Sequence, residues 1–170
     1  MKAKPTLITT IEMEVAIAKY FNFRKNIIVP NISWGFDIHE CDLFVIRNSG
    51  FAVEVEIKIS RSDLLKDFKK EHNHYDVKHR IAEFYYALPN YLYESCRDII
   101  PDSAGIIICE KHSNYKNVEI ITASLKKRAK RIKDARILTE REQMKIARLG
   151  AMRIWSLKEK NIRNGRDKKI

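Results

Sequence analysis

Apolar residues recur at helical intervals after Thr9, and three segments of the chain begin with the residues of a capping box or a close variant of one. In a capping box, a Ser or Thr side chain and an acidic side chain three residues later close the first turn of a helix. The pattern therefore predicts helices that begin at these positions. They are 10–22, after Thr9 with Glu12; 61–71, with Ser60 and Asp63; and a long helix to about residue 160, after Thr139 with Glu142.

Between the helical segments, runs rich in β-branched and aromatic residues predict strands. These runs are 26–35, which Pro30 interrupts, 43–46, 51–59, 82–88, 104–109 and a short edge strand at 118–121. The segment 48–50, with the sequence Asn-Ser-Gly, has the composition of a tight hairpin turn. A helix, a hairpin, a second helix and further strands in this order predict a central mixed sheet flanked by helices, of the α/β or α+β class.

The hairpin brings two carboxylates together. A three-residue turn over 48–50, with Gly50 in the left-handed conformation, places Asp42 directly opposite Glu56, with their Cβ atoms roughly 5 Å apart. Two carboxylates in this arrangement repel each other unless a cation is held between them. A two-residue turn would instead place Asp42 opposite Ile57, which weakens the geometry.

Metal chemistry is one interpretation of this carboxylate pair. Carboxylate oxygens without a nearby Cys pair favour Mg²⁺ or Mn²⁺ over Zn²⁺. Lys58 lies on the same face of the strand, where it could orient or deprotonate a water molecule that attacks a phosphate. The alternative is that Glu54, Glu56 and Lys58 form the solvated face of an antiparallel sheet, and Glu54 is expected to be partly exposed beside the site.

Length and composition limit the class of protein. A chain of 170 residues, of which 45% are hydrophobic, can bury a core as one folded body. Because it has neither an apolar run of about 18 residues nor a signal peptide after Met1, we expect a soluble, cytoplasmic protein without a membrane partner. Cys41, Cys96 and Cys109 include no C-x-x-C pair, which predicts buried reduced thiols.

Positive charge is concentrated at the carboxyl end of the chain. The formal net charge is +11, and 17 of the 33 basic but only 5 of the 22 acidic side chains follow residue 123. We therefore divide the chain into a core, 1–123, and a basic helical extension, 124–170, packed on or beside it, and expect DNA as the partner. The alternative is a solvated tail. The candidate nucleic-acid contacts are Arg61, Lys69, Lys70, Lys126, Lys127, Arg128, Lys130 and Arg131.

The chain has a helix with a glutamate, then an acidic residue on one strand, a hairpin, and an E-x-K triplet on the next strand. This arrangement resembles the core of the PD-(D/E)XK nucleases. The resemblance implies a restriction-endonuclease-like core and Mg²⁺-dependent hydrolysis of DNA phosphodiester bonds. It also implies the roles of five residues. Asp42 and Glu56 would be metal ligands, Ile57 would add its backbone carbonyl, Glu14 would be an additional carboxylate, and Lys58 would position the water.

The similarity extends over roughly residues 10–123, where the chain resembles the MmcB-like branch and related phage-borne proteins. The segments that carry it are 39–43, 55–63 with Asp67 and Lys70 after it, 84–89 and 104–107. One residue departs from the pattern in the family's name, since Cys41 and not proline precedes Asp42. The resemblance implies a role in DNA repair or in the processing of phage or mobile-element DNA.

Two other functions stay open at this level. A nucleic-acid-binding module could keep the same core without cutting, because some branches of the superfamily have lost catalysis. A protein-interaction or membrane-surface domain is less favoured, because no strongly amphipathic helix is expected to expose large apolar residues. The sequence does not determine whether the chain forms a homodimer, whether cleavage is endo- or exonucleolytic, or which strandedness of DNA is the substrate.

Overall fold

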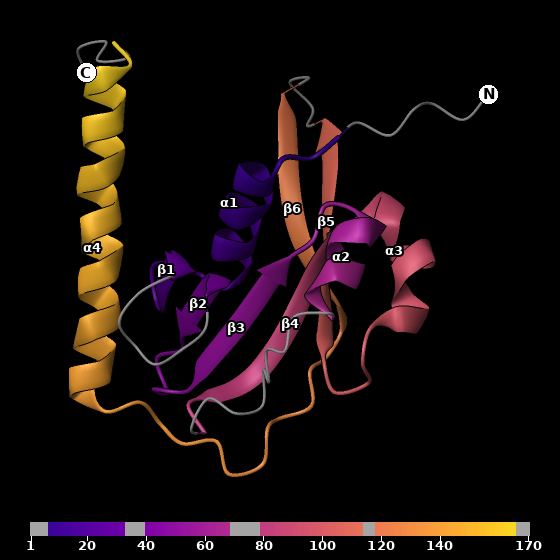
Figure 1. The fold of residues 1–170 in the computed structure, drawn as a ribbon, viewed down its shortest axis with the longest axis horizontal. Helices are drawn as coiled ribbons and strands as arrows, with labels where there is room; N and C mark the ends of the chain where they lie inside the picture. The colour runs from indigo at the N-terminus through magenta and orange to yellow at the C-terminus, as the bar shows by residue number, and fades with distance from the viewer. Residues whose placement is uncertain (1–6, 33–39, 69–78, 114–117, 166–170) are drawn as a thin grey trace.

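The structure is a computed structural model that describes residues 7–32, 40–68, 79–113 and 118–165 (Figure 1). The described helices are α1 (Thr10–Tyr20), α2 (Arg61–Asp67), α3 (Asn90–Cys96) and α4 (Glu140–Arg163), with a short 3₁₀ helix, η1 (Arg97–Ile99). The strands are β1 (Ile27–Ile32), β2 (Cys41–Ile46), β3 (Ala52–Ile57), β4 (Ile81–Pro89), β5 (Gly105–Ser113) and β6 (Glu119–Lys127). The three predicted helix starts are confirmed: Thr9 and Thr139 each form a complete capping box, and the Ser60 side chain caps α2.

One sheet contains these six strands in the order β1-β2-β3-β4-β5-β6. Strands β1, β2 and β3 pair antiparallel, β3, β4 and β5 pair parallel, and β6 returns antiparallel to β5. Helices α2 and α3 lie in the two crossovers that the parallel strands require. The prediction of a central mixed sheet flanked by helices is therefore confirmed, and the fold is of the α+β class.

Different helices cover the two faces of the sheet. On one face, Met13 and Ile17 of α1 pack against alternate residues of β2 and β3. On the other face, Leu64 of α2 and Cys96 of α3 pack against alternate residues of β4 and β5. Because both faces are covered, β3 and β4 are almost completely buried. The three cysteines are buried free thiols, as predicted.

The basic extension begins as part of the sheet. Strand β6 continues to Lys127, so the predicted boundary after residue 123 falls inside a strand, and the following segment, 128–138, is not helical. Figure 1 shows this segment passing across one end of the sheet. Its backbone N–H groups donate hydrogen bonds to the carbonyl oxygens of Ser103, Ala82 and Gly50, which lie just before or at the starts of β5, β4 and β3.

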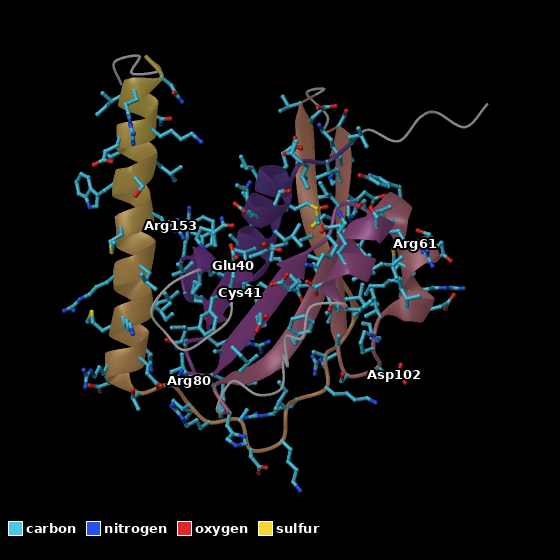
Figure 2. The ribbon with its side chains drawn as sticks, in the orientation of Figure 1. Glu40, Cys41, Arg61, Arg80, Asp102 and Arg153 are labelled. Carbon is cyan, nitrogen blue, oxygen red and sulfur yellow. The ribbon has the colours of Figure 1, made fainter. Side chains whose placement is uncertain are left out.

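Helix α4 stands beside β1 at the edge of the sheet (Figure 1). Ile146 packs against β1 and β2, and the Arg153 guanidinium donates a hydrogen bond to the backbone oxygen of Asn31 (Figure 2). Residues 151–163 of the helix are exposed, and their large apolar side chains are Met152, Ile154, Trp155, Leu157 and Ile162. The expectation that no strongly amphipathic helix exposes large apolar residues is therefore wrong. None of the described helices is long and apolar enough to cross a membrane.

Glu142 joins the 128–138 segment to the first turn of α4. Its carboxylate accepts hydrogen bonds of 2.7 and 2.6 Å from the Arg136 guanidinium and one of 2.8 Å from the Thr139 backbone N–H. Arg80, just before β4, lies 3.1 Å from the same carboxylate. The pKa of Glu142 is lowered to about 2, mainly because Arg136 donates these hydrogen bonds to the carboxylate. Burial of Glu142 opposes this shift.

Glu142→Gln is expected to lower the free energy of unfolding at pH 7 by about 1–3 kcal/mol, because charge-assisted hydrogen bonds are lost. The folded-state pKa lies below the ordinary value, so this contribution is present above about pH 4.5 and is lost as the pH falls toward 2. Urea unfolding at pH 7 and at low pH measures the difference, which should shrink on acidification. The control Glu140→Gln, on the same turn, should cost less than about 1 kcal/mol. A loss independent of pH would contradict the prediction.

Candidate functional site

The β2–β3 hairpin has the predicted three-residue turn. Gly50 has a φ of +81°, the left-handed conformation that this turn requires. Leu43 pairs with Val55 in the antiparallel register. The paired register ends there, and Asp42, the preceding residue of β2, lies within hydrogen-bond distance of Ile57, at the end of β3 where α2 follows.

Asp42 reaches across this end of the hairpin. Its Oδ2 atom accepts a hydrogen bond of 2.7 Å from the backbone N–H of Ile57. Burial raises the pKa of Asp42, although the Ile57 N–H and the positive charge of Lys58 oppose the shift. Burial and the neighbouring Asp42 charge also raise the pKa of Glu56, to about 7. Asp42 therefore lies close enough to Glu56 for its charge to disfavour the charged form of Glu56.

Lys58 occupies the centre of the group. Its Nζ atom donates to Oε2 of Glu56 at 2.7 Å and to Oδ1 of Asp67 at 2.9 Å. The exposed fractions of Lys58, Glu56 and Asp67 are only 5, 6 and 4%. Burial alone would lower the pKa of Lys58, but the two carboxylates more than offset this and raise it above the ordinary value. Lys58 is therefore a cation at neutral pH, which suits it to orient water and not to deprotonate it.

Asp67 and Tyr86 complete the cluster, and the sequence prediction gives neither of them a role in the site. The second oxygen of Asp67 accepts a hydrogen bond of 2.9 Å from the Tyr86 hydroxyl. Asp67 follows the buried Leu64 by three residues, so both side chains lie on the covered face of α2. The sequence shows this spacing, and it could have identified Asp67 as a buried carboxylate. Tyr86 lies beside Glu56 through the parallel register of β3 and β4, for which the sequence has no local signal.

Glu54 is completely buried, so the prediction that it is partly exposed is wrong. It pairs with Phe44 on β2 and with Phe84 on β4, in the middle of the sheet. The alternation of charged and apolar residues along β3 suggests a wet face, but α2, α3 and the start of α4 cover that face. The interpretation of these charged residues as a solvated sheet surface is excluded by their burial.

Glu14 approaches the group from α1. It is half-buried, and its Oε1 atom accepts a hydrogen bond of 3.3 Å from the side-chain amide of Asn31. Burial raises the pKa of Glu14, Asn31 opposes this, and the charge of Asp42 adds to it. Glu14 is therefore within electrostatic reach of Asp42. Among the described residues, however, no three His, Cys, Asp or Glu side chains are grouped so that they could hold a metal ion by themselves.

The predicted nucleic-acid contacts lie at different distances from this group. Arg61 opens α2, three residues after Lys58, and its exposed side chain donates to the backbone oxygen of Ser95 at 3.0 Å (Figure 2). Lys127 is level with Glu56 along the strands, because the registers of β6, β5, β4 and β3 align them. Three strand spacings separate them, or about 14 Å. Lys126 lies beside it, 5.0 Å from the centre of the Tyr93 ring.

The remaining basic candidates include one that lies away from the group. Arg131 stacks over Phe51 at 4.0 Å, at the opposite end of β3, about 17 Å along the strand from Glu56. Arg128 and Lys130 are exposed on the same 128–138 segment. Lys69 and Lys70 lie outside the described residues. The register therefore places Lys127 level with the acidic group, Arg61 follows the group in the sequence, and Arg131 lies at the far end of β3.

Fold and site together define an α+β protein with a six-stranded mixed sheet, in which a buried lysine and its carboxylates lie at the end of β3. No protein-family model matches the chain, and no curated protein matches it. Among solved structures, the chain is similar to SPO1766, a protein of unknown function from Silicibacter pomeroyi, with a TM-score of 0.58 and 13% identity over 100% of this chain and 99% of that one. At this identity the similarity shows a shared fold alone.

Proposed function

We propose that this protein is a Mg²⁺-dependent nuclease that hydrolyses DNA phosphodiester bonds, with Asp42, Glu56 and Lys58 at its centre. The observation that carries the proposal is the buried Lys58 ammonium between two carboxylates, with Asp42 on the neighbouring strand. Such a group is costly to bury and is typical of functional sites. DNA repair and the processing of phage or mobile-element DNA are the contexts that we propose for it.

The oxygen atoms of the group fit a hard divalent cation such as Mg²⁺ or Mn²⁺. Within the described part of the chain, Asp42 uses one carboxylate oxygen for the Ile57 N–H and Glu56 uses one for Lys58, so each has a second oxygen to offer. In a strand, the N–H and carbonyl of one residue point to the same side, which directs the Ile57 carbonyl toward Asp42. We propose these three ligands, with Glu14 as a nearby negative charge. A bound Mg²⁺ would polarise the phosphate and lower the pKa of the attacking water.

Lys58 acts in this proposal as a fixed cation. Tyr86 donates to Asp67, and Lys58 donates to both Asp67 and Glu56, so the ammonium is held in place from two sides. Its third N–H can donate to a water molecule or to a phosphate oxygen where negative charge develops. Asp67 is thus a positioning residue, which acts through Lys58 and needs no contact with the substrate.

A cleavage assay tests the proposed function. The protein is incubated with single-stranded, duplex and branched DNA in the presence of Mg²⁺ or Mn²⁺, and we expect at least one substrate to be nicked or degraded. EDTA should abolish the cleavage. Binding without cleavage of all three substrates would contradict the proposal and would favour the alternative, a non-catalytic nucleic-acid-binding module.

Metal binding also predicts a change in thermal stability. A cation that binds only the folded state raises the melting temperature, and at a hundredfold excess over Kd it adds about 2.7 kcal/mol. Asp42→Asn should leave the melting temperature without metal unchanged or higher, because the repulsion with Glu56 is relieved, and should abolish the response to metal. Differential scanning fluorimetry measures both effects.

The matched control for this experiment is Glu40→Gln, which changes an exposed carboxylate two residues away (Figure 2). It should respond to metal as the natural protein does. A metal-induced shift that survives in both Asp42→Asn and Glu56→Gln would place the metal elsewhere.

A further inference from the structure

Strand β6 leaves one edge of the sheet open. It is the last strand in the sheet order, so no strand among the described residues pairs with its outer side. The opposite edge strand, β1, contains Pro30 and is covered by α4. Strand β6 has nine residues and no proline. A long edge strand of this kind offers a row of backbone groups that another chain can pair with.

The sequence of β6 is complementary to itself when two copies run antiparallel. If Ala123 of one copy lies opposite Ala123 of the other, the residues on either side of it pair with each other as far as the bulge that precedes Lys127. Ile121 faces Leu125 on the same side of the sheet, and Thr122 faces Ser124 on the other side. Apolar pairs and hydroxyl pairs directly across a sheet are stabilising, so this register has favourable pairs on both sides of its centre.

Helix α1 provides a second observation. An open groove of about 290 Å³ runs between α1 and β6. Ile11, Val15, Ile120 and Ile121 form its apolar part, and Lys111, ion-paired with Glu12 and Glu119, forms a charged part. Ile11 and Val15 are 71 and 50% exposed, although they lie beside the core-facing side of α1. In an antiparallel pair of β6 strands, the two α1 helices lie on the same face of the joined sheet. Each would cover the exposed apolar side of the other.

We propose that the protein forms a two-fold symmetric dimer in which β6 pairs antiparallel with β6 of a second copy, centred on Ala123. The pairing continues the sheet from six to twelve strands and covers the groove between α1 and β6 on both copies. This interface does not depend on the proposed nuclease activity, because it uses the edge of the sheet and none of Asp42, Glu56 and Lys58.

Disulfide formation tests the register of the pairing. Thr122→Cys and Ser124→Cys are exposed single substitutions, and a mixture of the two variants should form a disulfide-linked dimer on mild oxidation. Directly opposite residues have Cα atoms about 4.5–5.5 Å apart, which suits a disulfide. Either variant alone places its thiols diagonally, about 7–8 Å apart, and should cross-link far less. The native cysteines are buried, so they give little background.

Charge substitutions at the same two positions test the interface in solution. T122K/S124K places lysines opposite lysines and should raise the dimer dissociation constant at least tenfold in sedimentation experiments. T122K/S124E changes the same residues but places each lysine opposite a glutamate, so the dimer should persist. T122E/S124E should dissociate like T122K/S124K, although it shifts the net charge in the other direction.

Three results would overturn the dimer. They are a monomeric mass for the natural chain at micromolar concentrations, equal cross-linking in the mixture and in the single-cysteine samples, and a dimer that T122K/S124K leaves intact. Circular dichroism of each variant establishes that it is folded. Cleavage of DNA by a monomeric variant would leave the proposed function standing, and a stable dimer without cleavage would leave the interface standing.

Discussion

Replacing Lys58 with alanine is expected to lower the rate of metal-dependent DNA cleavage by at least about 10²-fold, because a fixed donor to the developing negative charge is lost. DNA binding measured in Ca²⁺ should change little, since the Lys58 side chain is buried and the basic surface is untouched. Single-turnover cleavage at saturating protein separates the two effects. Cleavage at the natural rate by a folded Lys58→Ala protein would contradict the assignment.

The stability of this variant has to be measured alongside its activity. Without the ammonium, Glu56 and Asp67 lose their common partner, and breaking a buried ion pair costs about 3–5 kcal/mol. Lys58→Arg keeps the positive charge and should be more stable, yet its planar guanidinium should not restore full cleavage. The exposed Lys25→Ala serves as the control and should cleave like the natural protein.

Removing positive charge from the end of β6 and the segment after it is expected to weaken DNA binding regardless of sequence. Each phosphate contact contributes about 0.7–0.9 to the slope of log affinity against log salt concentration. Replacing Lys126, Lys127 and Lys130 with Gln should therefore flatten the slope by about two to three units, if all three contact phosphates. Fluorescence anisotropy with two unrelated DNA sequences over a range of salt concentrations measures the change.

The matched control removes three exposed positive charges at the end of α1, with Lys19, Arg24 and Lys25 replaced by Gln. Its salt slope should equal that of the natural protein. An unchanged slope in the β6 variant would identify these lysines as a solvated surface. The DNA path would then lie nearer to Arg61 and the site itself.

The part of the site that follows from local sequence could be predicted. Gly50 and the two residues before it determine the turn, the turn determines the register of β2 with β3, and the register brings Asp42 to Glu56. The capping residues in the same way determine where α1, α2 and α4 begin. Helix α3 begins after Pro89 without a side-chain cap, so it lacks the signal that reveals the others.

The remainder of the site depends on contacts between distant parts of the chain. Tyr86 is beside Glu56 because β3 and β4 pair in parallel, and no turn between them fixes that register. Glu54 is buried because helices from three other regions cover its face of the sheet. Alternating charge along a strand therefore indicates a common face, but it does not indicate whether that face meets water.

The hydrogen bonds of the 128–138 segment to the starts of three strands also bear on how the chain can be divided. A basic tail that only attracts DNA can be lost, exchanged or transferred to another protein as a module. Here the same stretch of backbone closes one end of the sheet and carries Arg128, Lys130 and Arg131 on its surface. Mutation can adjust the charge of this stretch one side chain at a time, whereas deletion of the stretch would remove part of the fold.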